Sequence, residues 1–134
     1  MSVQKVVSPI DVAVSGMRAQ SLRMNVTANN IANSNTSRAA GGQPYRRQRV
    51  LTTAGAGISG VQIVGVRGDY ATDFKKVLDA GNPDADENGF VNMPNVDLPI
   101  EMMQMVIAGR GYQANAAVLK KYQDMVDVAL EVIR

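Results

Sequence analysis

Residues 97–134 decide the fold, and they read DLPIEMMQMVIAGRGYQANAAVLKKYQDMVDVALEVIR. Apolar residues recur every seven positions on two neighbouring rows of a helix, which is the spacing of a coiled-coil seam. The rows are Met105, Tyr112, Leu119, Val126 and Ile133, and Met102, Gly109, Ala116, Gln123 and Leu130. Asp97 followed by Pro99 is a helix-start signal. We therefore predict one helix of about 36 residues, roughly 54 Å long.

Two glycines fall inside this predicted helix. Gly109 and Gly111 would each cost about 1 kcal/mol relative to alanine on a solvent-facing helix surface. They indicate either a weak spot in the helix or the close approach of another backbone. The sequence leaves both interpretations open.

A second seam lies near the amino terminus, over residues 10–33. Ser8 followed by Pro9 predicts its helix start, and the rod would be roughly 36 Å long. The seam consists of Ile10, Met17, Met24 and Ile31, with Val14, Ser21 and Ala28 between them. Such stripes usually form the core of their own molecule. These two stripes are longer than the middle of the chain can cover. We therefore predict that the two helices pair with each other in a parallel or antiparallel hairpin, that they pair with other subunits, or that they do both.

Asparagines are concentrated in MNVTANNIANSNT, residues 24–36, where they occupy five of thirteen positions. Asn25, Asn29 and Asn33 are spaced by four and share one helix face beside the seam. An amide donates and accepts hydrogen bonds without the desolvation cost of a buried charge. We predict polar contacts between helices there. Asn35 is expected to end the helix, because asparagine tolerates the left-handed conformation.

The middle of the chain is rich in glycine, with nine of the twelve glycines between Gly41 and Gly89. YRRQRVLTT from Tyr45 and GVQIVGV from Gly60 are strand candidates joined by AGAGISG, and DYATDFKKVLDAG and an acidic turn, NPDADENGF, follow. These features predict a small β subdomain or a partly flexible segment. The predicted fold class is mainly α, with a coiled-coil-like pair of long terminal helices. We divide it into segments 1–39, 40–96 and 97–134, which together form one structural unit.

The composition of the 134 residues excludes several functions. There is no histidine and no cysteine. This rules out Ser-His-Asp and Cys-His catalysis, His or Cys metal sites, and disulfides, and leaves an enzyme only carboxylates, lysine, serine or tyrosine. The net charge of +2 is too small for nonspecific electrostatic binding to nucleic acid or to a membrane surface. No apolar run is long enough to span a membrane. No cleavable signal peptide is evident, so if the protein acts outside the cytoplasm we expect a different export route.

Three motifs imitate binding sites. GAGISG matches a dinucleotide fingerprint at Gly55, Gly57 and Gly60, but a strand pattern follows where a helix is needed, which favours a hairpin loop.

DADENG begins like a calcium loop at Asp84, Asp86, Asn88 and Gly89, but Asn95 at its last position lacks the required carboxylate, which favours a solvated turn. Arg46, Arg47 and Arg49 have only Tyr45 as an aromatic neighbour, so we expect them to pair with carboxylates on neighbouring surfaces and not with nucleic acid.

The motifs resemble a known family. ANNIANSNT, residues 28–36, resembles the amino-terminal signature of the bacterial flagellar rod and hook proteins, the axial family. GRGYQANAAVLKKYQDMVDVAL, residues 109–130, is similar to the carboxy-terminal helix of that family around its R-x-Y-x-A-N element. Within the family, GGQPYRRQRV, GNPDADENGFVNMPNVDLPIEMM and the short length resemble the proximal rod proteins.

The resemblance implies a structural, non-enzymatic subunit of the proximal rod of the flagellar basal body. Such a subunit leaves the cytoplasm through the flagellar type III export apparatus and packs by its helices into a hollow, torque-transmitting shaft in the periplasm. Implied partners are that apparatus, other rod proteins, the rod adaptor to the MS ring, and copies of itself. No cofactor, metal, nucleic acid or small-molecule substrate is implied. The alternative is a soluble cytoplasmic coiled-coil binding module, such as an export chaperone.

The expected subunit contacts lie on both helices. On the amino-terminal helix they are Ile10, Val14, Met17, Ser21, Met24, Asn25, Ala28, Asn29, Asn30, Ile31, Asn33 and Asn35. On the carboxy-terminal helix they are Met102, Met105, Arg110, Tyr112, Asn115, Ala116, Leu119, Val126, Leu130 and Ile133. The substitution Asn33→Leu should weaken rod assembly more than it weakens the soluble protein. The terminal segments should be partly disordered until they dock.

Overall fold

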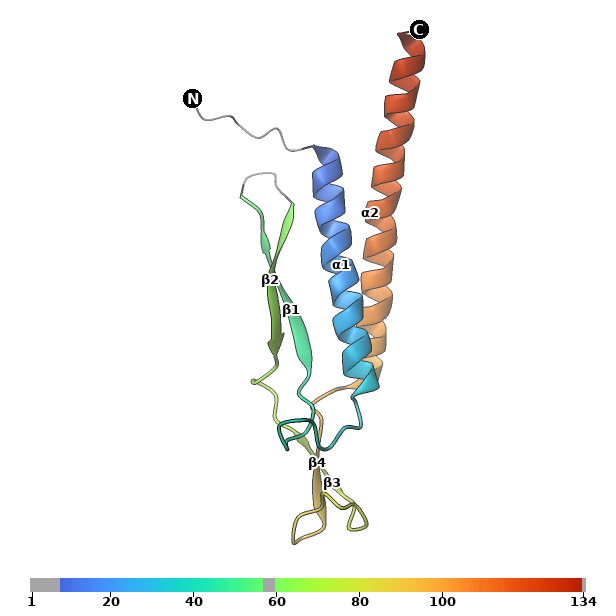
Figure 1. Cartoon of the computed structure of the whole chain (residues 1–134). Helices are drawn as coiled ribbons and strands as arrows, with labels where there is room; N and C mark the ends of the chain where they lie inside the picture. Colours follow the sequence, from blue (N-terminus) through green and yellow to red (C-terminus); the bar gives the residue numbers. More distant parts are fainter. Residues whose placement is uncertain (1–7, 57–59, 134) are drawn as a thin grey trace.

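Two long helices lie side by side in the computed structural model, which describes residues 8–56 and 60–133. The elements in chain order are α1 (Pro9–Ala32), β1 (Gln48–Ala54), β2 (Val61–Gly68), β3 (Lys75–Leu78), β4 (Phe90–Met93) and α2 (Leu98–Val132). The helices run antiparallel, the β1–β2 hairpin lies against α1, and the β3–β4 hairpin lies at the end opposite the C-terminus (Figure 1). The prediction of two long helices with short strands between them is confirmed.

Both helices begin where their caps predict. The Ser8 hydroxyl accepts a hydrogen bond from the Ile10 N–H at 3.2 Å, and the Asp11 carboxylate accepts one from the Ser8 N–H at 3.3 Å. The Asp97 carboxylate likewise accepts from the Ile100 N–H at 3.4 Å. These bonds satisfy amide groups that the first turn of a helix leaves without partners.

The prediction for the end of α1 is wrong. The helix ends at Ala32 with Asn33 as its cap, and both the backbone N–H and the side-chain amide of Asn33 donate to the Asn29 carbonyl, at 3.1 and 2.9 Å. No residue other than glycine in the described ranges has a positive φ, so Asn35 does not adopt the left-handed conformation. Asn33 already satisfies the last turn, which removes the need for a left-handed cap.

The antiparallel pairing of α1 and α2 leaves one of the two helix glycines in a tight contact. A Cβ atom on Gly111 would lie 3.0 Å from the Gln20 side-chain nitrogen, whereas one on Gly109 would meet only the Met24 sulfur, at 3.9 Å. Helix α2 continues through both positions. Gly111 is therefore a point of close helix approach and Gly109 is not.

Several contacts between the two helices fall beside the predicted seams. Facing positions are Gly16 with Asn115, Gln20 with Gly111, and Asn30 with Glu101. Gly16 and Gly111 each stand one place before a predicted seam residue. The apolar side chains buried between the elements are mostly small, namely Ala13, Ala19, Val26, Val91, Val96 and Ala108. The larger apolar side chains of the seams therefore lie on the flank of the helix pair.

The middle segment forms two separate antiparallel hairpins. Both predicted strands are confirmed in overlapping positions as β1 and β2, whereas β3 and β4 were not predicted. Ser15 holds the first hairpin to α1, because its hydroxyl accepts from the Val61 N–H at 3.1 Å. Gly57 of the fingerprint-like loop lies outside the described residues. No helix in the described ranges combines the length and hydropathy needed to cross a membrane.

Candidate functional site

A buried polar cluster joins the three segments of the chain near the end of α1. Asn30 and Glu101, each 1% exposed, lie at its centre. The Asn30 amide nitrogen donates to a Glu101 carboxylate oxygen and to the Gln48 carbonyl, both at 2.9 Å. Its oxygen accepts from the Tyr45 hydroxyl and the Gln48 N–H, also at 2.9 Å. One side chain of α1 thus satisfies groups from Tyr45, from Gln48 of β1 and from Glu101 of α2, as an amide with both donors and acceptors can.

Arg47 neutralises the two buried carboxylates of this cluster. Its side chain donates to Glu101 and lies 3.6 Å from an Asp69 oxygen. The Arg47 backbone N–H donates at 2.8 Å to Asn95, whose amide nitrogen donates to the Asp69 carbonyl at 3.0 Å. Buried charges persist only when they are paired and hydrogen-bonded. In the described ranges no buried side-chain nitrogen or oxygen lacks a hydrogen-bond partner.

Two groups of the cluster have shifted pKa values. Burial by itself raises the pKa of Asp69, but hydrogen bonds from Ala71 and Thr72 and the charge of Arg49 outweigh it and hold that pKa below the ordinary 3.8. Burial, and then the charge of Glu101, raise the pKa of the Tyr45 hydroxyl above 10.0. Asp69 is thus an anion, and Tyr45 a neutral hydrogen-bond donor, at neutral pH.

The asparagine that contacts α2 is not one of the three on the predicted face of α1. Asn25 and Asn29 are exposed, as is Asn35 beyond the helix, and Asn33 caps the helix. Asn30 makes the polar contact between the helices, and its contacts lie within the chain. Asn30 follows Val26 and Thr27 by four and three residues, so it shares their buried face.

Several residues of the cluster were missed from the sequence. Glu101 lies in the first turn of α2 among apolar residues, and that isolated charge was the available signal. Arg47 pairs with a carboxylate, Glu101, and Arg49 lies 3.9 Å from Asp69. Both carboxylates are buried within the chain, whereas the expectation placed them on neighbouring surfaces. Arg46 instead packs its guanidinium on the rings of Tyr70 and Phe74.

An apolar groove lies between α1 and α2 on one flank of the pair. It encloses about 260 Å³ and is lined by Val14, Met17, Arg18 and Ser21 of α1 and by Tyr112 and Leu119 of α2. All of these except Arg18 are seam positions predicted from the sequence. The structure therefore brings the amino-terminal and carboxy-terminal seams together on one surface.

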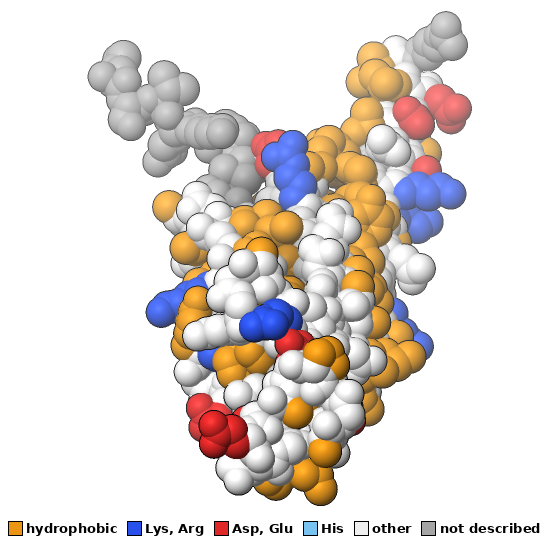
Figure 2. All heavy atoms as spheres, turned by 60° about the horizontal axis from the view of Figure 1, so that its bottom comes forward, with side chains coloured by type: hydrophobic (Ala, Val, Ile, Leu, Met, Phe, Trp, Pro, Cys, Tyr) orange, Lys and Arg blue, Asp and Glu red, His pale blue; other side chains and the backbone are white. Residues whose placement is uncertain are grey.

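The remaining predicted contact residues are half-buried or exposed. Half-buried ones are Ile10, Met24, Ile31, Met105, Asn115 and Ala116, and exposed ones are Ala28, Met102, Arg110, Val126, Leu130 and Ile133. Figure 2 shows hydrophobic side chains along one side of the molecule towards the C-terminus. Contiguous exposed apolar surface is a common feature of interaction sites. No group of three or more metal-binding side chains occurs in the described ranges.

Comparisons with known proteins identify similar sequences for both helices. Residues 10–39 match the family model "Flagella basal body rod protein". Residues 87–132 match the model "Flagellar basal body rod FlgEFG protein C-terminal". The two matches cover α1 and α2, the elements that line the groove, and Asn30 and Glu101 of the polar cluster.

Curated relatives match over most of their length. The flagellar basal-body rod protein FlgC of Escherichia coli O6:H1 is 42% identical over 120 residues, which cover 87% of this chain and 89% of the relative. FlgC of Salmonella typhimurium gives the same identity and coverage. FlgC of Borreliella burgdorferi is 36% identical over 149 aligned residues, covering 95% of this chain and 97% of the relative.

Proposed function

This chain belongs to the FlgC family of flagellar basal-body rod proteins, and from that premise we propose that its helix pair builds the proximal part of the rod. It is a structural subunit of the basal-body rod and not an enzyme. The groove between α1 and α2 carries the proposal about how it assembles. The apolar lining of this groove is in contact with water in the isolated subunit. Apolar side chains of a helix from a neighbouring subunit would fit the groove and cover that lining.

The far end of α2 supports the same assembly mode. Every residue from Gln123 to Val132 is exposed, and these include Met125, Val128 and Leu130. A helix end without tertiary packing is marginal in water. Neighbouring subunits would cover this end and bury its apolar side chains, which makes assembly favourable.

The terminal segments, 1–39 and 97–134, form the rod core in this proposal, and residues 40–96 face outward. The coiled-coil type of packing would occur between subunits. Within the chain, Gly16 and Gly111 leave room for the polar side chains of Asn115 and Gln20 on the facing helix, where a coiled coil would pack apolar side chains. The seam residues beside them stay available for neighbours.

Partners and export complete the proposal. The subunit would pass through the flagellar type III export apparatus and then contact other rod proteins, the rod adaptor to the MS ring and its own copies, forming a hollow shaft that transmits torque. The cytoplasmic binding module is not favoured, because the chain's relatives are basal-body rod proteins.

A charge placed in the groove tests the proposal. The variant Leu119→Glu should keep the helical content of the soluble protein but lower its amount in isolated basal bodies at least tenfold, since a buried unpaired carboxylate is strongly unfavourable. Val64→Glu is the matched control, because Val64 is 66% exposed on β2 and lies outside the groove. Normal incorporation of Leu119→Glu would refute the groove as a subunit contact.

A further inference from the structure

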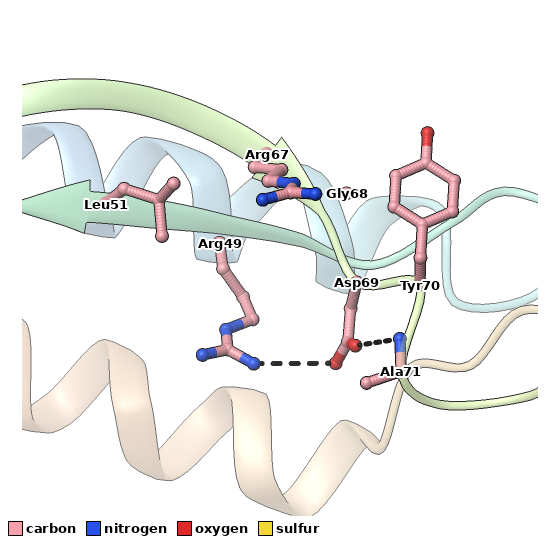
Figure 3. Close-up of a pocket in the computed structure, with 7 residues that line it drawn as sticks. All are labelled: Arg49, Leu51, Arg67, Gly68, Asp69, Tyr70 and Ala71. Carbon is pink, nitrogen blue, oxygen red and sulfur yellow. Dashed lines mark hydrogen bonds and ion pairs between the residues drawn. The ribbon is translucent and has the colours of Figure 1, made fainter.

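We propose that a basic recess at the base of the β1–β2 hairpin binds the acidic turn of a second copy of this chain; the proposal rests on the assembly function above. The recess measures about 250 Å³, and Figure 3 shows Arg49, Arg67 and Tyr70 around it, with Asp69 joined to Arg49 and Ala71. The acidic turn comprises residues 84–88, between β3 and β4.

Two arginines of the recess stand directly opposite each other. Arg49 of β1 pairs with Arg67 of β2 in the antiparallel register, which places both side chains on the same face. Like charges in this arrangement are destabilising. Arg49 has Asp69 at 3.9 Å, but Arg67 has no carboxylate partner in the part of the chain that the structure describes. An anion from outside the chain would relieve this repulsion.

One wall of the recess is held in place by Arg46. Its guanidinium carbon lies 4.7 Å from the ring centre of Tyr70 and 4.3 Å from that of Phe74, and it also donates to the Asp69 carbonyl at 2.8 Å. Tyr70 is 73% exposed despite these contacts. A fixed aromatic ring beside a free guanidinium suits a glutamate, whose methylene groups pack on the ring while its carboxylate meets the charge.

The acidic turn presents such a glutamate. Asp84 is already paired with Arg38 at 3.2 Å, and one Asp86 oxygen accepts two backbone hydrogen bonds that shape the turn. Glu87 is exposed and has no partner in the described ranges. The turn therefore holds one free carboxylate at a defined place.

The geometry favours a contact between copies. The two hairpins point in opposite directions in Figure 1, and no residue of the acidic turn lines the recess of its own chain. A contact between two different surfaces of identical subunits is heterologous and extends into a helical array when its rotation does not close. A rod requires an array of this kind.

A charge exchange tests the contact. Arg67→Glu and Glu87→Arg should each lower the amount of chain in isolated basal bodies at least fivefold, because each places like charges together. Combining both substitutions in one chain should restore at least half of the wild-type amount. Lys76→Glu, on the exposed face of β3, is the matched control and should assemble normally. Melting temperatures of the purified variants verify that each folds.

Three outcomes would overturn the contact. They are wild-type assembly of Arg67→Glu, a double variant no better than the singles, and no crosslink between copies. For the last, cells would make Arg67→Cys chains together with Glu87→Cys chains in a protein without natural cysteine, and a short bismaleimide should join them only in the mixture. Absence of the wild-type chain from basal bodies would instead refute the proposed function, and this contact with it.

Discussion

Glu101 is the residue at which the three segments of the chain are tied together. It meets Asn30 of α1 and Arg47 before β1, while its own backbone belongs to α2. The apolar core is made mostly of small side chains, so it specifies the arrangement of these segments only weakly. We infer that the buried Glu101 carboxylate, which needs both Arg47 and Asn30 as partners, helps to fix this arrangement.

Removing this charge should destabilise the fold. Glu101→Gln should lower the free energy of unfolding by about 2–4 kcal/mol. Arg47 then loses the nearer of its two buried countercharges and keeps only Asp69, at 3.6 Å. Urea denaturation at pH 7 measures the change. Lys121→Gln is the control, because it removes an ion pair with Asp124 whose side chains are 85% and 53% exposed. The control should change stability by less than about 0.5 kcal/mol, and equal small effects in both variants would contradict the role of Glu101.

Asp69 should make the fold sensitive to acid. Its pKa is lower in the folded chain than the ordinary 3.8, so the native state binds its proton less tightly than the unfolded state. The stabilisation is therefore present above the unfolded pKa and disappears as the pH falls through the folded pKa. Asp69→Asn should be less stable than the wild type at pH 7, with the difference shrinking below pH ~4. Urea denaturation across this range tests it, and a difference that is constant with pH would contradict it.

At the scale of elements, the two glycines of α2 should respond oppositely to the same substitution. Gly109→Ala should raise the free energy of unfolding by about 0.5–1 kcal/mol, since alanine favours the helix and the added carbon meets only ordinary contact. Gly111→Ala should give no gain or a loss, because its carbon would lie 3.0 Å from Gln20. Thermal unfolding of both variants measures this. An equal gain in both would disprove close helix packing at Gly111.

The helices were predictable because their signals are local. Ser8 and Asp97 cap their own first turns, and the apolar period follows from helix geometry. The face used inside the chain was not predictable. The period marks all apolar surface on a helix and does not distinguish which part packs within the chain. The contacts between the helices at Gly16 and Gly111 lie beside the predicted rows.

The polar cluster and the second hairpin depend on contacts that are distant in sequence. Arg47 and Glu101 are 54 residues apart, and no local pattern indicates their pairing. Strand β3 has four residues, all exposed, so it lacks the alternation that identifies a half-buried strand. The turn between β3 and β4 was visible, because asparagine, proline and glycine favour turns.

At the scale of the whole molecule, the chain is elongated and leaves much apolar surface uncovered. Helix α2 has 35 residues and α1 has 24, so the antiparallel pair leaves the end of α2 without a helix partner. The hairpins lie beside and below the pair (Figure 1), and the groove is lined by residues of α1 and α2 alone. This surface is consistent with a subunit whose packing is completed by its neighbours.

Amide hydrogen exchange should be faster at the uncovered end of α2 than in the part of α2 that packs on α1. In the purified subunit, amides of residues 123–132 should exchange rapidly, because that helix end has no tertiary contacts to protect it. Amides of residues 104–115, which pack on α1, should exchange more slowly. In assembled rods both regions should be protected. Strong protection of residues 123–132 in the monomer would show that the end of α2 needs no neighbour.

The most direct test of the account is crosslinking through the groove. A cysteine at Ser21 or at Ala116, in a protein that has none of its own, would be oxidised in cells and followed into isolated basal bodies. Lys76→Cys, away from the groove, serves as the control. The account predicts crosslinks to rod components in basal bodies from Ser21, which lines the groove, and from Ala116, a predicted contact residue of α2. Crosslinks confined to a soluble dimer, with unlabelled basal bodies, would contradict it.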